Sequence, residues 1–176
     1  GGAAPDFVIE RRGEVYFIFG TGQAHQEGNI ESRGLAIGFK EKISRRCSIG
    51  FEHQNDGHPQ NDPQQNHRDS FKITSLCEYP IAGGLRLEGG GGLGPTFNTV
   101  TRDGQEYDEH AFGKSLIVAI VQQLGRSGWN VRAQGEYTTA DRSFHTWTYM
   151  LGLGHNLGRE GGFKSGGDGG PGRLAI

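Results

Sequence analysis

Apolar and polar side chains alternate along much of this chain with a period of two, which is the pattern of β-strands with one apolar face. The alternation is clearest over residues 129–137, where Trp129, Val131 and Tyr137 share one face and Arg132 and Glu136 share the other. No segment has the spacing of an amphipathic helix. The same period predicts eight strands: Glu14–Ala24, Gly34–Ile43, Cys47–His53, Ser70–Tyr79, Leu85–Thr96, Gly113–Leu124, Trp129–Thr138 and Thr146–Leu157.

The connections between these strands alternate strictly in length. Three are tight, at residues 44–46, 80–84 and 125–128, and four are longer and polar, at residues 25–33, 54–69, 97–112 and 139–145. We therefore predict an all-β fold, an eight-stranded antiparallel up-and-down β-barrel with long loops at one rim and tight turns at the other. The even strand count places both chain ends at the short-turn rim. The barrel domain is predicted over residues 14–158, after an N-terminal arm (1–13) and before a flexible Gly-rich tail (159–176).

Composition narrows the class of protein. The 32 glycines argue against helices and fit closely packed or bent strands. No apolar run approaches the ~18 residues of a membrane helix, but strands that cross a membrane need only ~9–11 residues. The formal net charge of -2, without a basic stripe, gives no indication of a nucleic-acid partner.

The alternation fits two opposite proteins, because a membrane barrel turns its apolar face outward and a soluble carrier barrel turns it inward. The strict loop asymmetry favours the membrane plan, as do aromatic residues near strand ends, among them Tyr16, Tyr79, Trp129 and Trp147. The polar face carries both signs of charge, and an eight-stranded barrel has room inside only for side chains. We therefore predict an interior plugged by a charge network of Glu52, Lys72, Glu78, Arg86, Glu88, Arg132 and Glu136.

Three segments, residues 85–93, 129–137 and 149–157, resemble strands of the small eight-stranded outer-membrane barrels of the OmpA-transmembrane-domain and OmpX type. The resemblance implies a non-enzymatic protein of the bacterial outer membrane, with a structural or adhesive role. Membrane lipid and lipopolysaccharide are the implied partners, with a surface ligand at the outward loops. A soluble ligand-binding barrel remains the alternative.

The chain departs from this family at its C-terminal end and at its N-terminus. The last predicted strand ends in Leu157 and Gly158 rather than in an aromatic residue, and a tail follows. A barrel redesigned to be soluble in water would show such a departure. No secretory signal peptide is visible and the first residue is Gly1, which we interpret as a mature or engineered form.

The second long loop contains the residue types of an acyl-transfer site. Some outer-membrane barrels are lipid A acyltransferases or deacylases, and Ser70, His53, His67 and Asp69 are the candidate catalytic residues here. The His-x-Ser-Asn motif of the deacylases is missing from the stretch 138–141, so an enzyme is the less favoured hypothesis. His and Asp in this loop are also candidate metal ligands, but the composition is typical of a hydrated surface loop. We therefore predict no metal and no cofactor.

An acidic stretch and a pair of cysteines are the remaining candidate functional features. Residues 101–110 form an acidic stretch, which either holds a cation between lipopolysaccharide phosphates or keeps the rim soluble. Cys47 and Cys77 lie at the ends of neighbouring predicted strands, where they are candidate cross-strand partners. Either a disulfide or two free thiols fits this placement.

Overall fold

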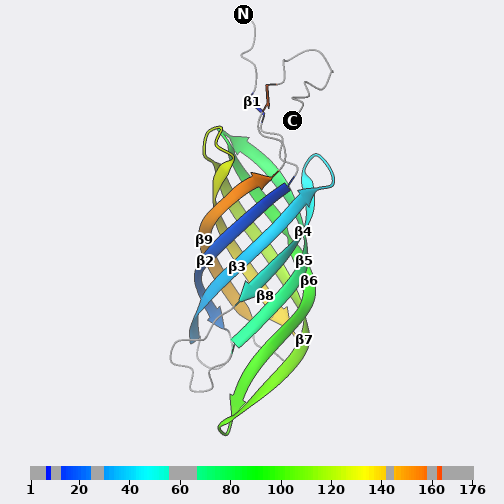
Figure 1. The fold of residues 1–176 in the computed structure, drawn as a ribbon, viewed down its shortest axis with the longest axis vertical. Helices are drawn as coiled ribbons and strands as arrows, with labels where there is room; N and C mark the ends of the chain where they lie inside the picture. The colour runs from blue at the N-terminus through cyan, green and yellow to red at the C-terminus, as the bar shows by residue number, and fades with distance from the viewer. Residues whose placement is uncertain are drawn as a thin grey trace, which may run out of the picture.

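The computed structural model describes residues 7–8, 13–24, 30–55, 67–141, 145–157 and 162–163. Eight antiparallel strands, β2 to β9, follow one another around a single closed barrel, and β9 pairs with β2 to close it (Figure 1). The predicted eight-stranded antiparallel barrel is confirmed. No helix among the described residues has the length and apolar character needed to cross a membrane.

The barrel strands agree with the predicted ones most closely at the short-turn rim. Their bounds are β2 (Gly13–Ala24), β3 (Ile30–Lys42), β4 (Cys47–Asn55), β5 (His67–Ala82), β6 (Leu85–Arg102), β7 (Gln105–Gln123), β8 (Trp129–Ala140) and β9 (Thr146–Leu157). A separate pair is formed by β1 (Phe7–Val8) and β10 (Gly162–Phe163). Most of the predicted arm and tail lies outside the described residues, so the boundaries of both stay predictions.

Two of the three tight turns, at residues 80–84 and 125–128, contain glycines with a left-handed backbone. Between β5 and β6, Gly83 and Gly84 have φ values of 57° and 80°, as the two central residues of a type I′ hairpin turn require. This turn matches the right-handed twist of the strands that flank it. The three tight connections, β3–β4, β5–β6 and β7–β8, lie at one end of the barrel, which we call the short-turn rim (Figure 1).

The predicted long loop over residues 97–112 is wrong. β6 and β7 remain paired to their tips, from Leu85 opposite Gln122 to Arg102 opposite Gln105. The turn consists of Asp103 and Gly104, both with positive φ (51° and 77°). This hairpin extends beyond the other strands at the opposite end of the barrel, the long-loop rim (Figure 1). The acidic stretch 101–110 is therefore a β-hairpin tip rather than an irregular loop.

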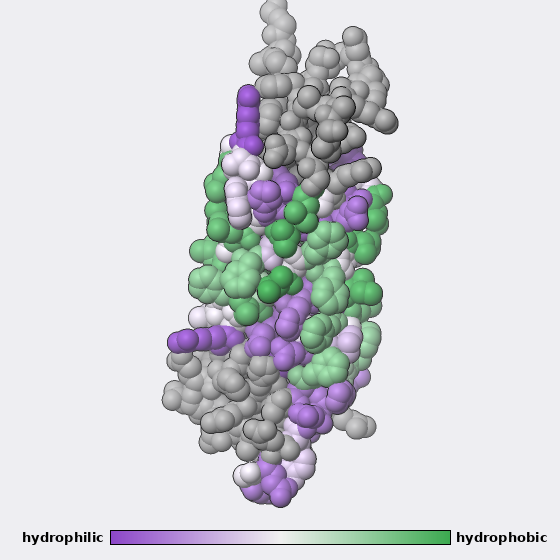
Figure 2. All heavy atoms as spheres, viewed as in Figure 1, coloured by the Kyte–Doolittle hydropathy of each residue, from purple (hydrophilic) through white to green (hydrophobic). Residues whose placement is uncertain are grey.

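Side chains alternate strictly between the interior and the outer surface. On the face shown in Figure 2, outward apolar side chains gather over the middle of the barrel, with more polar zones toward its two ends, and we call the outward apolar positions of all strands the apolar belt. The belt includes Phe17, Phe19, Ile37, Phe51, Ile73, Leu93, Leu116, Val118, Ile120, Leu151 and Leu153, each 46–65% exposed. The interior is mostly polar, with an apolar cluster of Tyr16, Ile18, Ala36 and Met150 and further buried apolar side chains on β5, β7 and β8, namely Leu76, Ile117, Ala119, Val121 and Ala140.

The placement of Tyr16 in an outer aromatic belt is wrong. Its side chain is only 2% exposed and lies inside the barrel. The reason is the period of two, because Tyr16 shares the inward face of β2 with Glu14 and Ile18.

Candidate functional site

The barrel interior nearest the short-turn rim holds a group of ion pairs centred on Glu88. Lys40 Nζ lies 2.7 Å from both carboxylate oxygens of Glu88. Arg86 Nε donates to Glu88 Oε2 at 2.7 Å, and Arg132 Nη1 donates to Oε1 at 2.8 Å. Glu88 is fully buried, so three cations compensate one carboxylate that water does not reach.

Arg86 extends this group toward the short-turn rim. Its Nη2 donates to Glu14 Oε2 at 2.6 Å, and its Nε lies 3.4 Å from Glu78 Oε2. Glu78 in turn accepts a hydrogen bond from Lys42 Nζ at 2.7 Å. These contacts join strands β2, β3, β5 and β6 across the interior.

A second group lies deeper in the barrel and is centred on Lys72. The ammonium group donates to Gln54 Oε1 at 2.7 Å and to Ser115 Oγ at 2.8 Å, and it also forms an ion pair with Glu136. Glu52 Oε1 lies 3.5 Å away. All of these side chains except Ser115 are fully buried, and four different strands supply the group.

Arg132 and Gln134 of β8 link the two groups. Arg132 Nε donates to Gln134 Oε1 at 2.8 Å, while its guanidinium group lies over the ring of Tyr16, 4.3 Å from the centroid. Gln134 Nε2 then donates to Glu52 Oε2 at 3.1 Å and to Glu136 Oε2 at 2.9 Å. One polar network therefore runs through the middle of the barrel.

The structure places all seven residues of the predicted interior network inside the barrel. It adds Glu14 and Lys40, which the sequence reasoning missed, together with Tyr16, whose hydroxyl donates to Glu52. The alternation with a period of two could have identified Glu14 and Lys40 as inward residues. Glu14 and Lys40 are paired across β2 and β3, and both belong to the polar face of their strands.

Three of the four candidate acyl-transfer residues have described side chains, and these three do not assemble. Ser70 is fully buried in the interior, whereas His53 and Asp69 project from the outer surface and contact each other at 3.2 Å. Gln54, not His53, lies opposite Ser70 in the strand pair. Consecutive residues of a strand point to opposite faces of the sheet. Asp69 and Ser70 are consecutive, so their side chains lie on opposite sides of the barrel wall. The side chain of His67 lies outside the described residues.

Metal ligands do not gather in the part of the chain that the structure describes, where no group of three or more His, Cys, Asp or Glu side chains is placed to hold an ion. Most of the second long loop, residues 56–66, lies outside that part. The hairpin tip carries Asp103 and Asp108 as exposed side chains.

Cys47 and Cys77 are bonded to each other as a disulfide. They are direct partners in the β4–β5 register, with Cα atoms 4.0 Å apart. Both side chains point outward near the short-turn rim, where Ser48 and Glu78 on either strand turn inward. The bond fixes the register of this hairpin at the end opposite to its long connection.

Histidines of the outer surface pack against aromatic rings at the edges of the apolar belt. His53 stacks on Phe71 with 4.4 Å between ring centroids, and His110 meets Phe97 edge to face at 4.8 Å. The other two pairs with resolved ring contacts are His145 with Tyr137 and His155 with Trp129. These side chains combine an apolar body with a polar edge, as residues at a boundary between lipid and water do.

An apolar outer belt, a charged interior and long connections at one rim define the small eight-stranded outer-membrane β-barrel. Neisserial surface protein A superposes with a TM-score of 0.72 at 8% identity, covering 82% of this chain and 97% of that one. The N-terminal β-barrel domain of Pseudomonas aeruginosa OprF gives 0.63 at 11% identity, covering 84% and 98%. Ail, the attachment invasion locus protein of Yersinia pestis, gives 0.61 at 14% identity, covering 84% and 99%.

At these identities the likeness establishes the fold alone. No protein-family model and no curated protein sequence matches the chain.

Proposed function

We propose that this chain is a non-enzymatic barrel of the bacterial outer membrane, with a plugged interior and a structural or recognition role through its outward loops. The observation that carries the proposal is the inverted distribution of side chains. Large apolar residues face outward, while charged residues fill the inside. In water such a surface exposes far more contiguous apolar area than a soluble monomer carries. A lipid bilayer removes the free-energy cost of exposing this apolar area to water.

The buried charges support a plugged interior rather than a channel. Among the described residues, five buried carboxylates (Glu14, Glu52, Glu78, Glu88 and Glu136) accompany five buried cations (Lys40, Arg68, Lys72, Arg86 and Arg132). The two signs are therefore equal in number among these buried side chains. Side chains that bond to one another across the lumen support a plug, as does the small bore of eight strands.

The outward recognition role is supported by the β6–β7 hairpin. It extends beyond the other strands at the long-loop rim (Figure 1), and in this fold that rim faces the cell exterior. The acidic stretch 101–110 contains four acidic residues and one basic residue, Arg102. The Ail protein has been crystallised with the heparin analogue sucrose octasulfate, a polyanion. The hairpin here has the opposite charge preference, so we propose a basic surface partner for it.

The proposal is tested by refolding the chain in plain buffer, in detergent micelles and in lipid vesicles. Circular dichroism and heat-dependent gel mobility report the barrel. We expect the folded, heat-modifiable form only with detergent or lipid, and only small, rare conductance steps in a planar bilayer. A monodisperse barrel in buffer alone would support the soluble alternative, and steady pore conductance would contradict the plug.

A further inference from the structure

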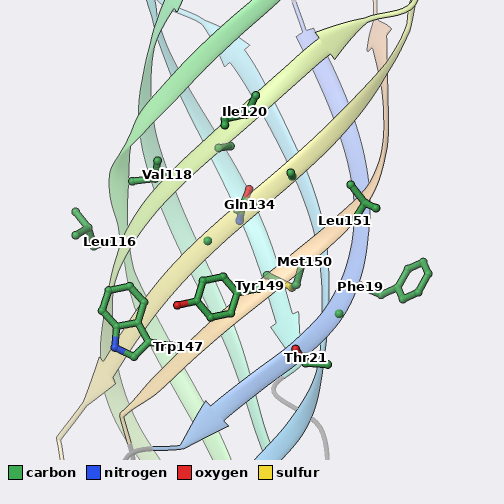
Figure 3. Close-up of a pocket in the computed structure, with 14 residues that line it drawn as sticks. Phe19, Thr21, Leu116, Val118, Ile120, Gln134, Trp147, Tyr149, Met150 and Leu151 are labelled. Carbon is green, nitrogen blue, oxygen red and sulfur yellow. The ribbon is translucent and has the colours of Figure 1, made fainter.

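β7 has a free backbone edge where it extends beyond β8 at the long-loop rim (Figure 1). In the middle of the barrel β8 covers this side of β7, and Figure 3 shows it between Val118 of β7 and Tyr149 of β9. β8 ends opposite Gly113, so none of the described strands is paired with Gln105–Phe112 on the side away from β6. The connection from β8 to β9 covers only residues 141–145 and must return to β9, so it is too short to run along this segment. We call Gln105–Phe112 the free edge of β7.

The backbone hydrogen bonds of β7 show which groups point to the free edge. Gln123 N–H donates to the Gly84 carbonyl oxygen on the β6 side, and Leu124 N–H donates to the Trp129 carbonyl oxygen on the β8 side. The registers with β6 and β8 run along β7 without a shift, so its even-numbered residues direct their backbone groups away from β6. At the free edge, the even-numbered residues are Glu106, Asp108, His110 and Phe112.

The charges along the free edge disfavour pairing with a second copy of the chain. Asp108 and His110 have exposed side chains. In the two antiparallel registers with the most overlap, Asp108 or Glu109 lies opposite the same residue of the second copy. Like charges directly opposite each other destabilise a sheet, and natural proteins place charges on open edges for this reason. The free edge is therefore protected against its own copy but open to a strand of opposite charge.

We propose that the free edge of β7 binds one extended, basic segment of a partner protein by adding it to the sheet as a further strand. The inference rests on the proposed function, which gives the hairpin a basic partner, and it names the mode of binding. The added strand exchanges backbone hydrogen bonds with Glu106, Asp108 and His110. A Lys or Arg opposite Asp108 forms a cross-strand ion pair, which selects a basic segment over a neutral or acidic one.

The test measures binding of a fluorescent peptide of alternating lysine and valine to the barrel in nanodiscs of phosphatidylcholine, a lipid without net charge. His110→Pro removes one N–H of the free edge but no hydrogen bond to β6, and edge strands tolerate Pro. His110→Ala is the matched control, because it keeps the N–H and loses the same ring contact with Phe97. Asp108→Asn removes one charge. Carbon-13 in the carbonyl groups of the peptide lets infrared spectroscopy report whether the bound peptide is a strand.

We expect wild type and His110→Ala to bind the peptide with equal affinity. His110→Pro should bind it about tenfold more weakly, as the loss of one or two strand hydrogen bonds implies. Asp108→Asn should weaken binding about threefold, within the range of one cross-strand ion pair. Equal binding by the two His110 variants, a bound peptide without the infrared band of a strand, or dimers of the barrel joined through the hairpin would overturn the inference.

The failure of this inference is distinguishable from the failure of the proposed function. A peptide that binds through charge alone, without strand structure, removes the added strand but leaves the basic partner. A wild-type barrel that binds no peptide removes both. The infrared measurement on the wild type decides the mode of binding even where His110→Pro does not fold.

Discussion

Glu52 and Lys72 lie directly opposite each other on β4 and β5, and both side chains are fully buried inside the barrel. Their charged groups are 3.5 Å apart, and Lys72 pairs with Glu136 of β8 as well. A buried charge without a partner is very costly, so each of these residues depends on the other two. The network therefore specifies which polar faces can meet inside the barrel.

Removing one carboxylate from the interior should destabilise the fold strongly. Glu88→Gln keeps the size of the side chain but leaves Lys40, Arg86 and Arg132 with one negative charge fewer. We expect a loss of about 3–5 kcal/mol in the free energy of unfolding, measured by denaturant titration in lipid vesicles. Glu41→Gln is the matched control, because Glu41 faces outward and is exposed. Similar losses in both variants would count against the network.

A charge on the outer belt should cost free energy according to depth. Ile73 and Ile43 are similarly exposed, at 65% and 67%, but Ile73 lies in the middle of β5 and Ile43 at the short-turn rim. We expect Ile73→Arg to destabilise the lipid-embedded barrel by about 2–4 kcal/mol, and Ile43→Arg by about 0–1 kcal/mol. The same titration in vesicles measures both. Equal effects would mean that the outer surface does not contact lipid.

The disulfide should contribute to stability through the unfolded chain. It closes a segment with a sequence separation of 30 residues, for which the chain-entropy relation gives about 3–4 kcal/mol. We expect a reductant to lower the unfolding midpoint of the wild type to that of the double variant Cys47→Ser/Cys77→Ser. The double variant itself should not respond to reductant. If reductant also lowered the unfolding midpoint of the double variant, the loss of stability would not come from this disulfide.

Ser70→Ala should leave both folding and chemistry unchanged. Within the described part of the chain, the Ser70 hydroxyl has no hydrogen-bond partner, so its removal leaves no group unpaired and is expected to be neutral or slightly stabilising. Release of fatty acid from lipid A, followed by mass spectrometry, should be absent with wild type and variant alike. Release by wild type that disappears in Ser70→Ala would restore the enzyme hypothesis.

The period of two predicted the barrel and most of its faces because burial is strict in a narrow lumen. It identified Arg132 and Glu136 as inward residues from β8 alone. It failed at the long-loop rim, where both faces of β6 and β7 become polar and the alternation fades. The Asp103-Gly104 pair, a strong signal for a two-residue hairpin turn, would have revealed the extended hairpin.

Other predictions were wrong because residues were assigned by side-chain chemistry or by the loop they flank, not by their position along the strand. Tyr16 was assigned to the outer belt because it is aromatic, but its strand position places it under Arg132. His53 and Ser70 were grouped because they flank one loop, but they lie on opposite faces of the barrel wall. In both cases the position along the strand decided the environment. Which side chains bond across the lumen could not be predicted, because those partners come from strands far apart in sequence.

The outward direction of the apolar face is the central claim, and the two tryptophans of the chain test it most directly. Trp129 and Trp147 lie on the outer surface, near opposite rims, and are 47% and 38% exposed. The variants Trp129→Phe and Trp147→Phe each leave a single reporter in the folded barrel. Brominated lipids in the vesicle bilayer quench only a tryptophan that touches the acyl chains. We predict that both reporters are quenched, more strongly by shallow than by deep bromines. Two reporters untouched by bromines at every depth, in a chain that is folded, would contradict the account.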